Sequence, residues 1–264
     1  MIDTSTIDTI LIPDVHGRKF WLEATPYIEQ GVRTIFMGDY LDPYSHEGVT
    51  KNEAIENFME ILSWRDHDNV EFLLGNHDCG YRYDFNICDC RTDRRNLRKI
   101  QQLFWDNKEI FKLCSLVGEN CVISHAGIHE EWYHKINGSE GKDNPQEIVD
   151  TVNKLLTDYP YKDMITLLSW VSYERGGYDI VGSVVWADIH EWGEDKNTFI
   201  PRQIVGHTMQ IEAMRGEKGE WLYRPTTPLH NVLRNITCID CQHCFYLDKE
   251  GDLRYLDTGE LAVK

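Results

Sequence analysis

Five short apolar runs in this chain end in the same way, with Asp, His or Asn beside a glycine. The runs are Thr9–Ile12, Thr34–Met37, Val70–Leu74, Cys121–Ser124 and Gln203–Val205. The clusters that follow them are Pro13-Asp14-Val15-His16-Gly17, Gly38-Asp39-Tyr40-Leu41-Asp42, Gly75-Asn76-His77-Asp78, His125-Ala126-Gly127 and Gly206-His207-Thr208. Short β-branched apolar runs predict buried strands. The chain is therefore expected to form a β-sheet core that carries reactive side chains at five strand ends.

Helical patterns alternate with the early strands. Apolar spacing predicts helices over Lys19–Glu29, Lys51–Trp64 and Asn96–Leu113. Further along, we expect a helix at Pro145–Thr157 and short strands at Gly182–Trp186, Ile236–Ile239, Cys244–Leu247 and Leu253–Leu256. Such βα units followed by strands favour a mixed α/β (α+β) fold with a sheet-on-sheet core flanked by helices. At 264 residues without a linker-like tract, one domain over residues 1–264 is expected.

The chain is strongly acidic, since 27 Lys and Arg against 44 Asp and Glu leave a formal charge of −17. Such a surface repels phosphate backbones, so non-specific nucleic-acid binding is not expected, although a local cation can still hold an anionic substrate. The N-terminal residues lack the features of a signal peptide, and no apolar stretch is long enough to span a membrane. These features predict a cytoplasmic protein with no membrane partner.

The strand-end clusters are rich in metal-ligand side chains. Carboxylates, imidazoles and an amide oxygen suit divalent manganese, iron or zinc. Six such ligands exceed what one catalytic ion needs, and two ions about 3.5–4 Å apart, bridged by one carboxylate, fit better. A single Asp-x-His or Gly-His-Thr would more simply be a turn or a core histidine. Five clusters in this order favour the metal site.

The clusters resemble the motif series of the calcineurin-like metallophosphoesterases, in the branch of the serine/threonine phosphoprotein phosphatases and bacterial diadenosine tetraphosphatases. The matching segments are Pro13–Gly17, Gly38–Asp42, Gly75–Asp78, Ser124–Gly127 and Val205–Thr208. The resemblance implies a central β-sandwich of two mixed sheets flanked by helices. It also implies a metal-dependent hydrolase that acts on phosphate esters.

Carried over position by position, the resemblance implies a site with two metal ions. The first ion would be held by Asp14, His16 and Asp39, and the second by Asp39, Asn76, His125 and His207. The nucleophile would be the water or hydroxide that bridges the ions. His77 would then be the general acid, oriented by Asp42 through a charge-assisted hydrogen bond.

Two family arginines are missing from this chain. The usual Asp-Arg-Gly is Asp42-Pro43-Tyr44 here, and the Arg before Gly-Asn-His is Leu74. Those arginines clasp the substrate phosphate in the family, so the clamp here must come from elsewhere or the substrate must differ. Arg18 is the first candidate for a phosphate contact. The other local cations are Arg91, Arg94, Arg95, Arg98 and Lys99, a run that also fits a solvated helix start.

The eight cysteines allow two interpretations. Buried, reduced thiols are favoured in a chain of this size without a signal peptide. The alternative is a structural zinc site, for which Cys238, Cys241 and Cys244 with Cys88 and Cys90 offer thiolates.

Several functions remain open from the sequence. The substrate could be a phosphorylated small molecule, a nucleotide or a phosphoprotein, so the enzyme could be a protein phosphatase or a dinucleoside-polyphosphate hydrolase. A different class is a catalytically silent metal-binding protein of the same fold. The complete ligand set and the His77–Asp42 pair favour the enzyme.

Overall fold

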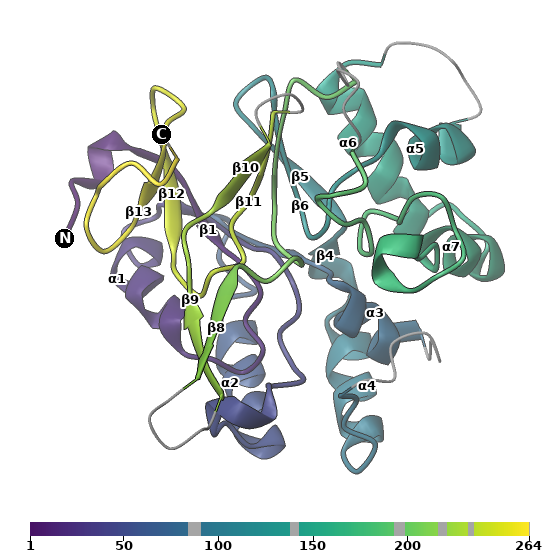
Figure 1. Ribbon diagram of the computed structural model, residues 1–264, viewed down its shortest axis with the longest axis horizontal. Helices are drawn as coiled ribbons and strands as arrows, with labels where there is room; N and C mark the ends of the chain where they lie inside the picture. The colour runs from purple at the N-terminus through teal and green to yellow at the C-terminus, as the bar shows by residue number, and fades with distance from the viewer. Residues whose placement is uncertain (84–90, 138–142, 193–198, 216–220, 232–234, 264) are drawn as a thin grey trace.

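Two mixed β-sheets form the centre of the computed structural model, which describes residues 1–83, 91–137, 143–192, 199–215, 221–231 and 235–263 (Figure 1). The first sheet holds, in spatial order, β13 (Leu253–Tyr255), β12 (Phe245–Asp248), β1 (Ile7–Ile12), β2 (Arg33–Phe36), β3 (Val70–Leu73) and β4 (Phe111–Lys112). The second holds β10 (Leu229–Asn231), β11 (Ile236–Cys238), β7 (Arg202–Val205), β6 (Cys121–Ser124) and β5 (Cys114–Val117). This confirms the mixed α/β sandwich expected from the sequence.

Alternating side chains of the strands build two apolar layers. Leu11 and Ile35 from the first sheet share a buried cluster with Ile123 and Ile204 from the second, so this cluster lies between the sheets. The neighbouring residue Phe36 points the other way and joins the larger cluster that includes the helices. A strand that is buried on both faces shows apolar residues at every position, which explains the continuous apolar runs in the sequence.

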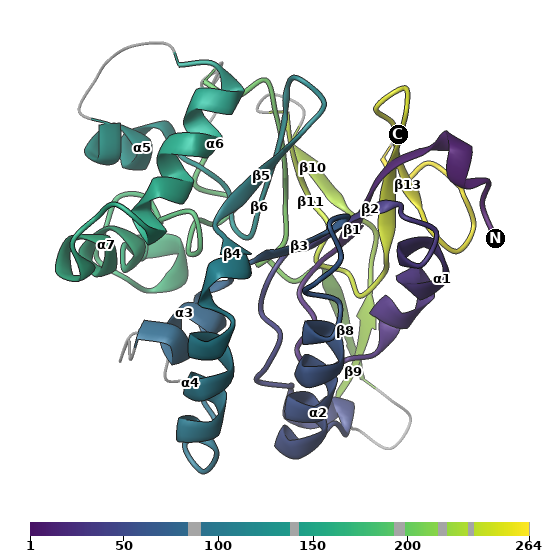
Figure 2. The ribbon, with the colours of Figure 1, turned by 180° about the vertical axis from the view of Figure 1, so that it is seen from behind.

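Helices flank the sandwich (Figures 1 and 2). Their bounds are Thr25–Ile28 (α1), Lys51–Leu62 (α2), Asn76–Tyr83 (α3), Leu97–Asp106 (α4), Glu130–Asn137 (α5), Pro145–Asn153 (α6) and Tyr161–Leu168 (α7). The Phe58 ring of α2 lies 4.9 Å from both the Tyr40 ring and the Phe104 ring of α4, while α6 contacts β5 and β6. A separate hairpin is formed by β8 (Ile211–Arg215) and β9 (Trp221–Pro225). None of the described helices is both long and apolar enough to cross a membrane.

Some predicted elements differ from the structure. The expected strand Gly182–Trp186 is a turn, in which the backbone N–H groups of Trp186 and Ala187 both donate to the Ser183 carbonyl. The expected helix Asn96–Leu113 ends at Asp106, because the chain then enters β4. The elements that the sequence did not predict are α3, α5, α7, β5, β10 and the β8–β9 hairpin.

Candidate metal centre

The side chains predicted to bind metal come together where five strands end. β1, β2 and β3 are parallel neighbours in the first sheet, as are β6 and β7 in the second, so their carboxyl ends lie together. Two groups of possible ligand atoms result, each with its atoms within 4.8 Å of one another. The groups are Asp14 with His16 and Asp39, and Asp39 with His125 and His207. Asp39 belongs to both.

Several of these residues have a strained backbone. His16, Asp39, Asp42 and His207 adopt φ values of 46°, 52°, 61° and 65°, in the left-handed region that side chains with a Cβ rarely occupy. Such conformations cost about 1–3 kcal/mol each and persist only where the surroundings impose them. Their concentration at the strand ends indicates that these loops are shaped for a function rather than for stability.

Two glycines allow the loops to approach closely. A Cβ on Gly75 would lie 2.1 Å from Asp39 Oδ1, and a Cβ on Gly206 would lie 2.1 Å from Asp14 Oδ1. Any side chain at either position would displace a candidate ligand carboxylate. This close approach explains why glycine stands beside the polar residues in these clusters.

Backbone carbonyls fix the orientation of two histidines. His16 Nδ1 donates to the Leu41 carbonyl at 2.8 Å, and His125 Nδ1 donates to the Met37 carbonyl at 2.9 Å. Nε2 of each ring is thereby directed at Asp39 Oδ2, at 3.5 Å and 3.7 Å. Such outer hydrogen bonds are typical of metal-ligating histidines. Burial also lowers the pKa of His16 well below its ordinary value, which keeps the ring in the neutral form that ligates.

The donor set fits bound cations. His125 Nε2 lies 3.1 Å from both Asn76 Oδ1 and His207 Nδ1, and His207 Nε2 is buried with no hydrogen-bond partner. Asp14 and Asp39 are 1% and 2% exposed, and within the described chain neither is ion-paired with a lysine or arginine. Burial raises the pKa of Asp14, and the neighbouring Asp39 carboxylate adds to that shift. A cluster of buried lone pairs and carboxylates of this kind is unfavourable without cations.

Asp78 is a positioning residue for which the sequence predicted no role, although it stands in one of the strand-end clusters. Its buried carboxylate accepts the backbone N–H groups of Asp39 at 2.6 Å, Gly75 at 2.8 Å and Tyr40 at 3.1 Å. It therefore ties the loop after β2 to the loop after β3. Its place in the Gly75–Asp78 cluster was the available signal.

His77 lies beside the ligand cluster and is held by a carboxylate. Its Nδ1 is 2.7 Å from Asp42 Oδ2, and the Tyr81 hydroxyl donates to the other Asp42 oxygen. The His77 ring also packs edge-on against the His16 ring, with centroids 5.3 Å apart. Nδ1 of His77 is therefore occupied by Asp42, while Nε2 is approached by Arg91.

Three arginines lie around the centre. Arg18 is 8% exposed and pairs through Nε with Glu47 at 3.1 Å, while its Nη2 is buried without a hydrogen-bond partner. Arg91 Nη2 lies 3.3 Å from His77 Nε2, and its guanidinium stacks on the Tyr44 ring 3.6 Å from the centroid.

Arg175 was not predicted from the sequence to lie near the centre. It pairs with Asp188 at 2.7 Å and donates to the Thr208 hydroxyl beside His207. Arg175 stands in no strand-end cluster, and only the tertiary fold brings it to the centre.

The described cysteines show no metal cluster. Cys79, Cys114, Cys121, Cys238, Cys241 and Cys244 are buried free thiols, and none belongs to a possible metal group in the described chain. Cys88 and Cys90 lie outside the described residues. A further acidic group, Asp248 with Glu250 and Asp252, sits in the β12–β13 turn, where Arg254 pairs with Asp248.

Sequence comparison identifies a family. The calcineurin-like phosphoesterase model matches residues 9–210, which is most of the chain and includes every strand-end cluster. We found no match among curated proteins.

Two solved structures, both of cold-active protein-tyrosine phosphatases, share the fold. A cold-active protein-tyrosine phosphatase from a psychrophilic Shewanella species aligns over 98% of this chain and 81% of its own, with a TM-score of 0.55 and 15% identity. A second structure titled as a cold-active protein-tyrosine phosphatase aligns over 96% and 77%, with a TM-score of 0.55 and 14% identity. A serine/threonine phosphatase from Saccharomyces cerevisiae aligns over 93% and 74%, with a TM-score of 0.47 and 12% identity.

Proposed function

This chain belongs to the calcineurin-like phosphoesterase family, and from that premise we propose that it is a dinuclear-metal phosphoesterase that hydrolyses phosphate esters with water. The observation that carries the proposal is Asp39, whose carboxylate belongs to both groups of ligand atoms. The first ion would be held by Asp14, His16 and Asp39, and the second by Asp39, Asn76, His125 and His207. Manganese, iron or zinc suits these donors. When bound, the ions supply Lewis acidity and lower the pKa of water.

We assign the proton transfer to His77. Its ring packs against that of the candidate ligand His16, and the Asp42 carboxylate would stabilise the protonated ring through Nδ1. As water attacks phosphorus, the bond to the leaving oxygen breaks and His77 gives that oxygen its proton. The arrangement needs no covalent intermediate with the protein.

We assign the phosphate contact to Arg91 ahead of Arg18. Nε of each arginine is engaged, in Arg18 by Glu47 and in Arg91 by the Asp42 carbonyl, but Nη2 of Arg91 also lies beside Nε2 of His77. An N–H of Arg91 that points at His77 Nε2 requires this nitrogen to be unprotonated. A substrate phosphate that accepts the Arg91 N–H groups would free Nε2 to carry the proton. Arg91 would therefore supply, from another segment, the cation that this chain lacks at Pro43 and Leu74.

The test is reconstitution of the metal-free protein. We expect two first-row divalent ions per chain after addition of manganese, and hydrolysis of 4-nitrophenyl phosphate that depends on them. Phosphopeptides, nucleotides and dinucleoside polyphosphates would then rank the substrate classes. Binding of a single ion at saturation, or equal hydrolysis without metal, would contradict the dinuclear assignment.

A further inference from the structure

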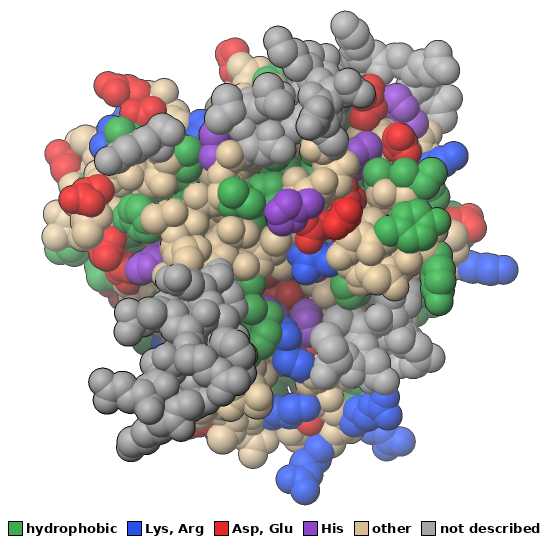
Figure 3. Space-filling model, viewed as in Figure 1, with side chains coloured by type: hydrophobic (Ala, Val, Ile, Leu, Met, Phe, Trp, Pro, Cys, Tyr) green, Lys and Arg blue, Asp and Glu red, His purple; other side chains and the backbone are tan. Residues whose placement is uncertain are grey.

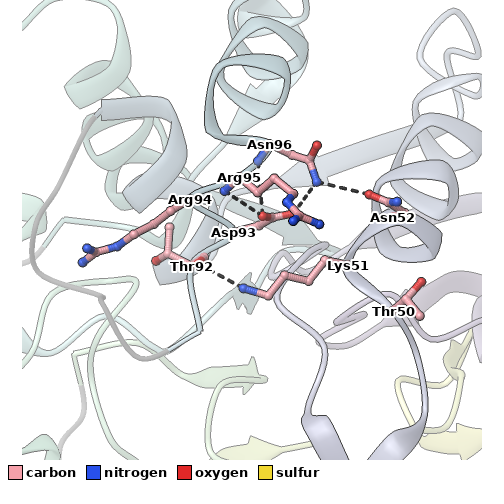
Figure 4. A pocket seen from close by; sticks show the side chains of 8 residues that line it. All are labelled: Thr50, Lys51, Asn52, Thr92, Asp93, Arg94, Arg95 and Asn96. Carbon is pink, nitrogen blue, oxygen red and sulfur yellow. Dashed lines mark hydrogen bonds between the residues drawn. The ribbon is translucent and has the colours of Figure 1, made fainter.

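A pocket of about 520 Å³ opens between the first turn of α2 and the start of α4, outside the metal centre (Figure 4). Lys51 and Asn52 of α2 line one side, and Thr92, Arg95 and Asn96 line the other. Its size is in the range of small-molecule sites, which is typically 300–1,000 Å³. None of these residues belongs to the strand-end clusters.

The pocket offers cationic donors. Lys51 Nζ donates to the carbonyls of Arg91 at 2.9 Å and Thr92 at 3.1 Å, which leaves its third N–H available. The guanidinium of Arg95 is exposed and makes no hydrogen bond or ion pair with any residue that the structure describes. Figure 4 shows both side chains on the pocket wall, with the Lys51 ammonium directed at Thr92.

The one carboxylate in the pocket wall is already engaged. Asp93 is 4% exposed and accepts the backbone N–H groups of Arg95 at 3.1 Å and Asn96 at 3.2 Å, and the Asn96 side-chain amide at 2.7 Å. Its charge is thus directed into the protein. On a chain of charge −17, this face is locally positive: Figure 3 shows Lys and Arg side chains that continue from the central hollow over the part of the surface formed by α2 and α4.

Arg91 connects the pocket to the reacting group. Its guanidinium lies 3.3 Å from His77 Nε2, while its own carbonyl oxygen holds Lys51. The general acid stands on the side of the leaving group, because it protonates the leaving oxygen. The pocket therefore adjoins the residue whose guanidinium contacts His77.

We propose that this pocket binds a second phosphate carried by the leaving group, so that the preferred substrates are small molecules with two or more phosphates, such as nucleoside polyphosphates. The inference rests on the proposed function. In hydrolysis the water oxygen bonds to the attacked phosphorus, the P–O bond to the leaving group breaks, and the departing oxygen keeps the electron pair while its remaining phosphate stays in the pocket. Lys51 and Arg95, on the wall of this open pocket, match the charge of one phosphate group.

The kinetic test compares Arg95→Gln with Arg98→Gln. Both remove one exposed positive charge from the same stretch of chain, but Arg98 does not line the pocket. We expect Arg95→Gln to lower the ratio of kcat/KM for ATP to kcat/KM for 4-nitrophenyl phosphate by about tenfold, as for loss of a charged hydrogen bond. Arg98→Gln should keep the wild-type ratio. Lys51→Met should repeat the Arg95→Gln effect, and a sugar bisphosphate as third substrate shows whether the second phosphate alone suffices.

A binding test separates this inference from the proposed function. Calorimetry measures inorganic pyrophosphate on the reconstituted wild type and both glutamine variants. Weaker binding in Arg95→Gln alone supports the pocket even if no ester is hydrolysed. Equal binding and equal substrate ratios in Arg95→Gln and Arg98→Gln would overturn it. So would a loss confined to acidic phosphopeptides, since that would make this face a protein-docking surface.

Discussion

The candidate metal centre and the 91–96 segment beside it are built in opposite ways. The metal centre sits on strand ends, its carboxylates are almost fully buried, and four of its loop residues have left-handed backbones. The 91–96 segment runs irregularly into α4, and its arginines Arg94 and Arg95 are exposed. The difference indicates that the candidate metal centre rests on the sheets, and under the proposal above substrate choice would rest on a segment that can vary without disturbing them.

Asp39→Asn should have the largest effect, because it removes the negative charge of the one carboxylate that belongs to both groups of ligand atoms. We expect both ions to bind more weakly and turnover to fall by about 10³-fold or more, since single electrostatic contacts at a reacting centre contribute about 10²–10³-fold. Metal content and kcat are the measurements, with the exposed Asp66→Asn as the matched control. Retention of both ions and full turnover would show that Asp39 does not bridge.

His77→Asn should have the next largest effect, and it tests chemistry that is separable from metal binding. Both ions should stay, while turnover of esters with poor leaving groups falls about 10²–10⁴-fold. The loss should be much smaller for 4-nitrophenyl phosphate, whose leaving group needs little protonation.

Asp42→Asn should reproduce part of the His77 defect, because the Asp42 carboxylate holds Nδ1. The double variant should be little worse than His77→Asn, since the two act as one unit. Equal losses for good and poor leaving groups would remove the general-acid role. Loss of metal in His77→Asn would instead show that His77 is a metal ligand.

The contrast between the strand-end metal centre and the irregular 91–96 segment also explains which features the sequence predicted. Local signals placed the strands and their polar ends, because a buried strand and a glycine-flanked ligand each leave a pattern within a few residues. The close approach of Gly75 to Asp39 and of Gly206 to Asp14 is the physical basis of that pattern.

Contacts between distant segments leave no such pattern. Arg91 reaches His77 through stacking on Tyr44, and Arg175 reaches the loop of His207 from the 160–200 region. The prediction of a strand over Gly182–Trp186 was wrong for a related reason. An apolar run that folds as a buried turn has the same composition as a strand. Only the tertiary fold places these residues.

Arg91→Met should have an intermediate effect, on kinetics rather than folding. We expect kcat and kcat/KM to fall about 10–100-fold, because a charged contact that strengthens in the transition state is lost. Its melting temperature should change little, since the side chain is only partly buried.

Arg18→Met is the comparison for Arg91→Met. It leaves Glu47 unpaired in a nearly buried site, so we expect the free energy of unfolding to fall by about 3 kcal/mol. Steady-state kinetics and urea unfolding of both variants are the measurements. A kinetic defect confined to Arg18→Met would return the phosphate contact to Arg18, the first candidate from sequence.

Replacing Cys238, Cys241 and Cys244 together by Ser should have the smallest effect on function. Burial raises the pKa of all three thiols, which favours neutral thiols over the thiolates that zinc requires. Cys238 Sγ donates instead to the carbonyls of Gly206 and Thr208, both at 3.1 Å.

A serine hydroxyl can donate to the same carbonyls that Cys238 contacts, so the loop that carries His207 should keep its shape. We therefore expect two ions per chain and turnover within about twofold of wild type. The free energy of unfolding should fall by about 1–3 kcal/mol, because hydroxyls replace thiols in a buried environment. An alanine triple variant is the control, since it removes the donors while adding no buried hydroxyl; if it alone slows turnover, the Cys238 hydrogen bonds position His207. Loss of a third, tightly bound zinc from the serine variant would instead establish the structural zinc site and extend metal binding beyond the strand ends.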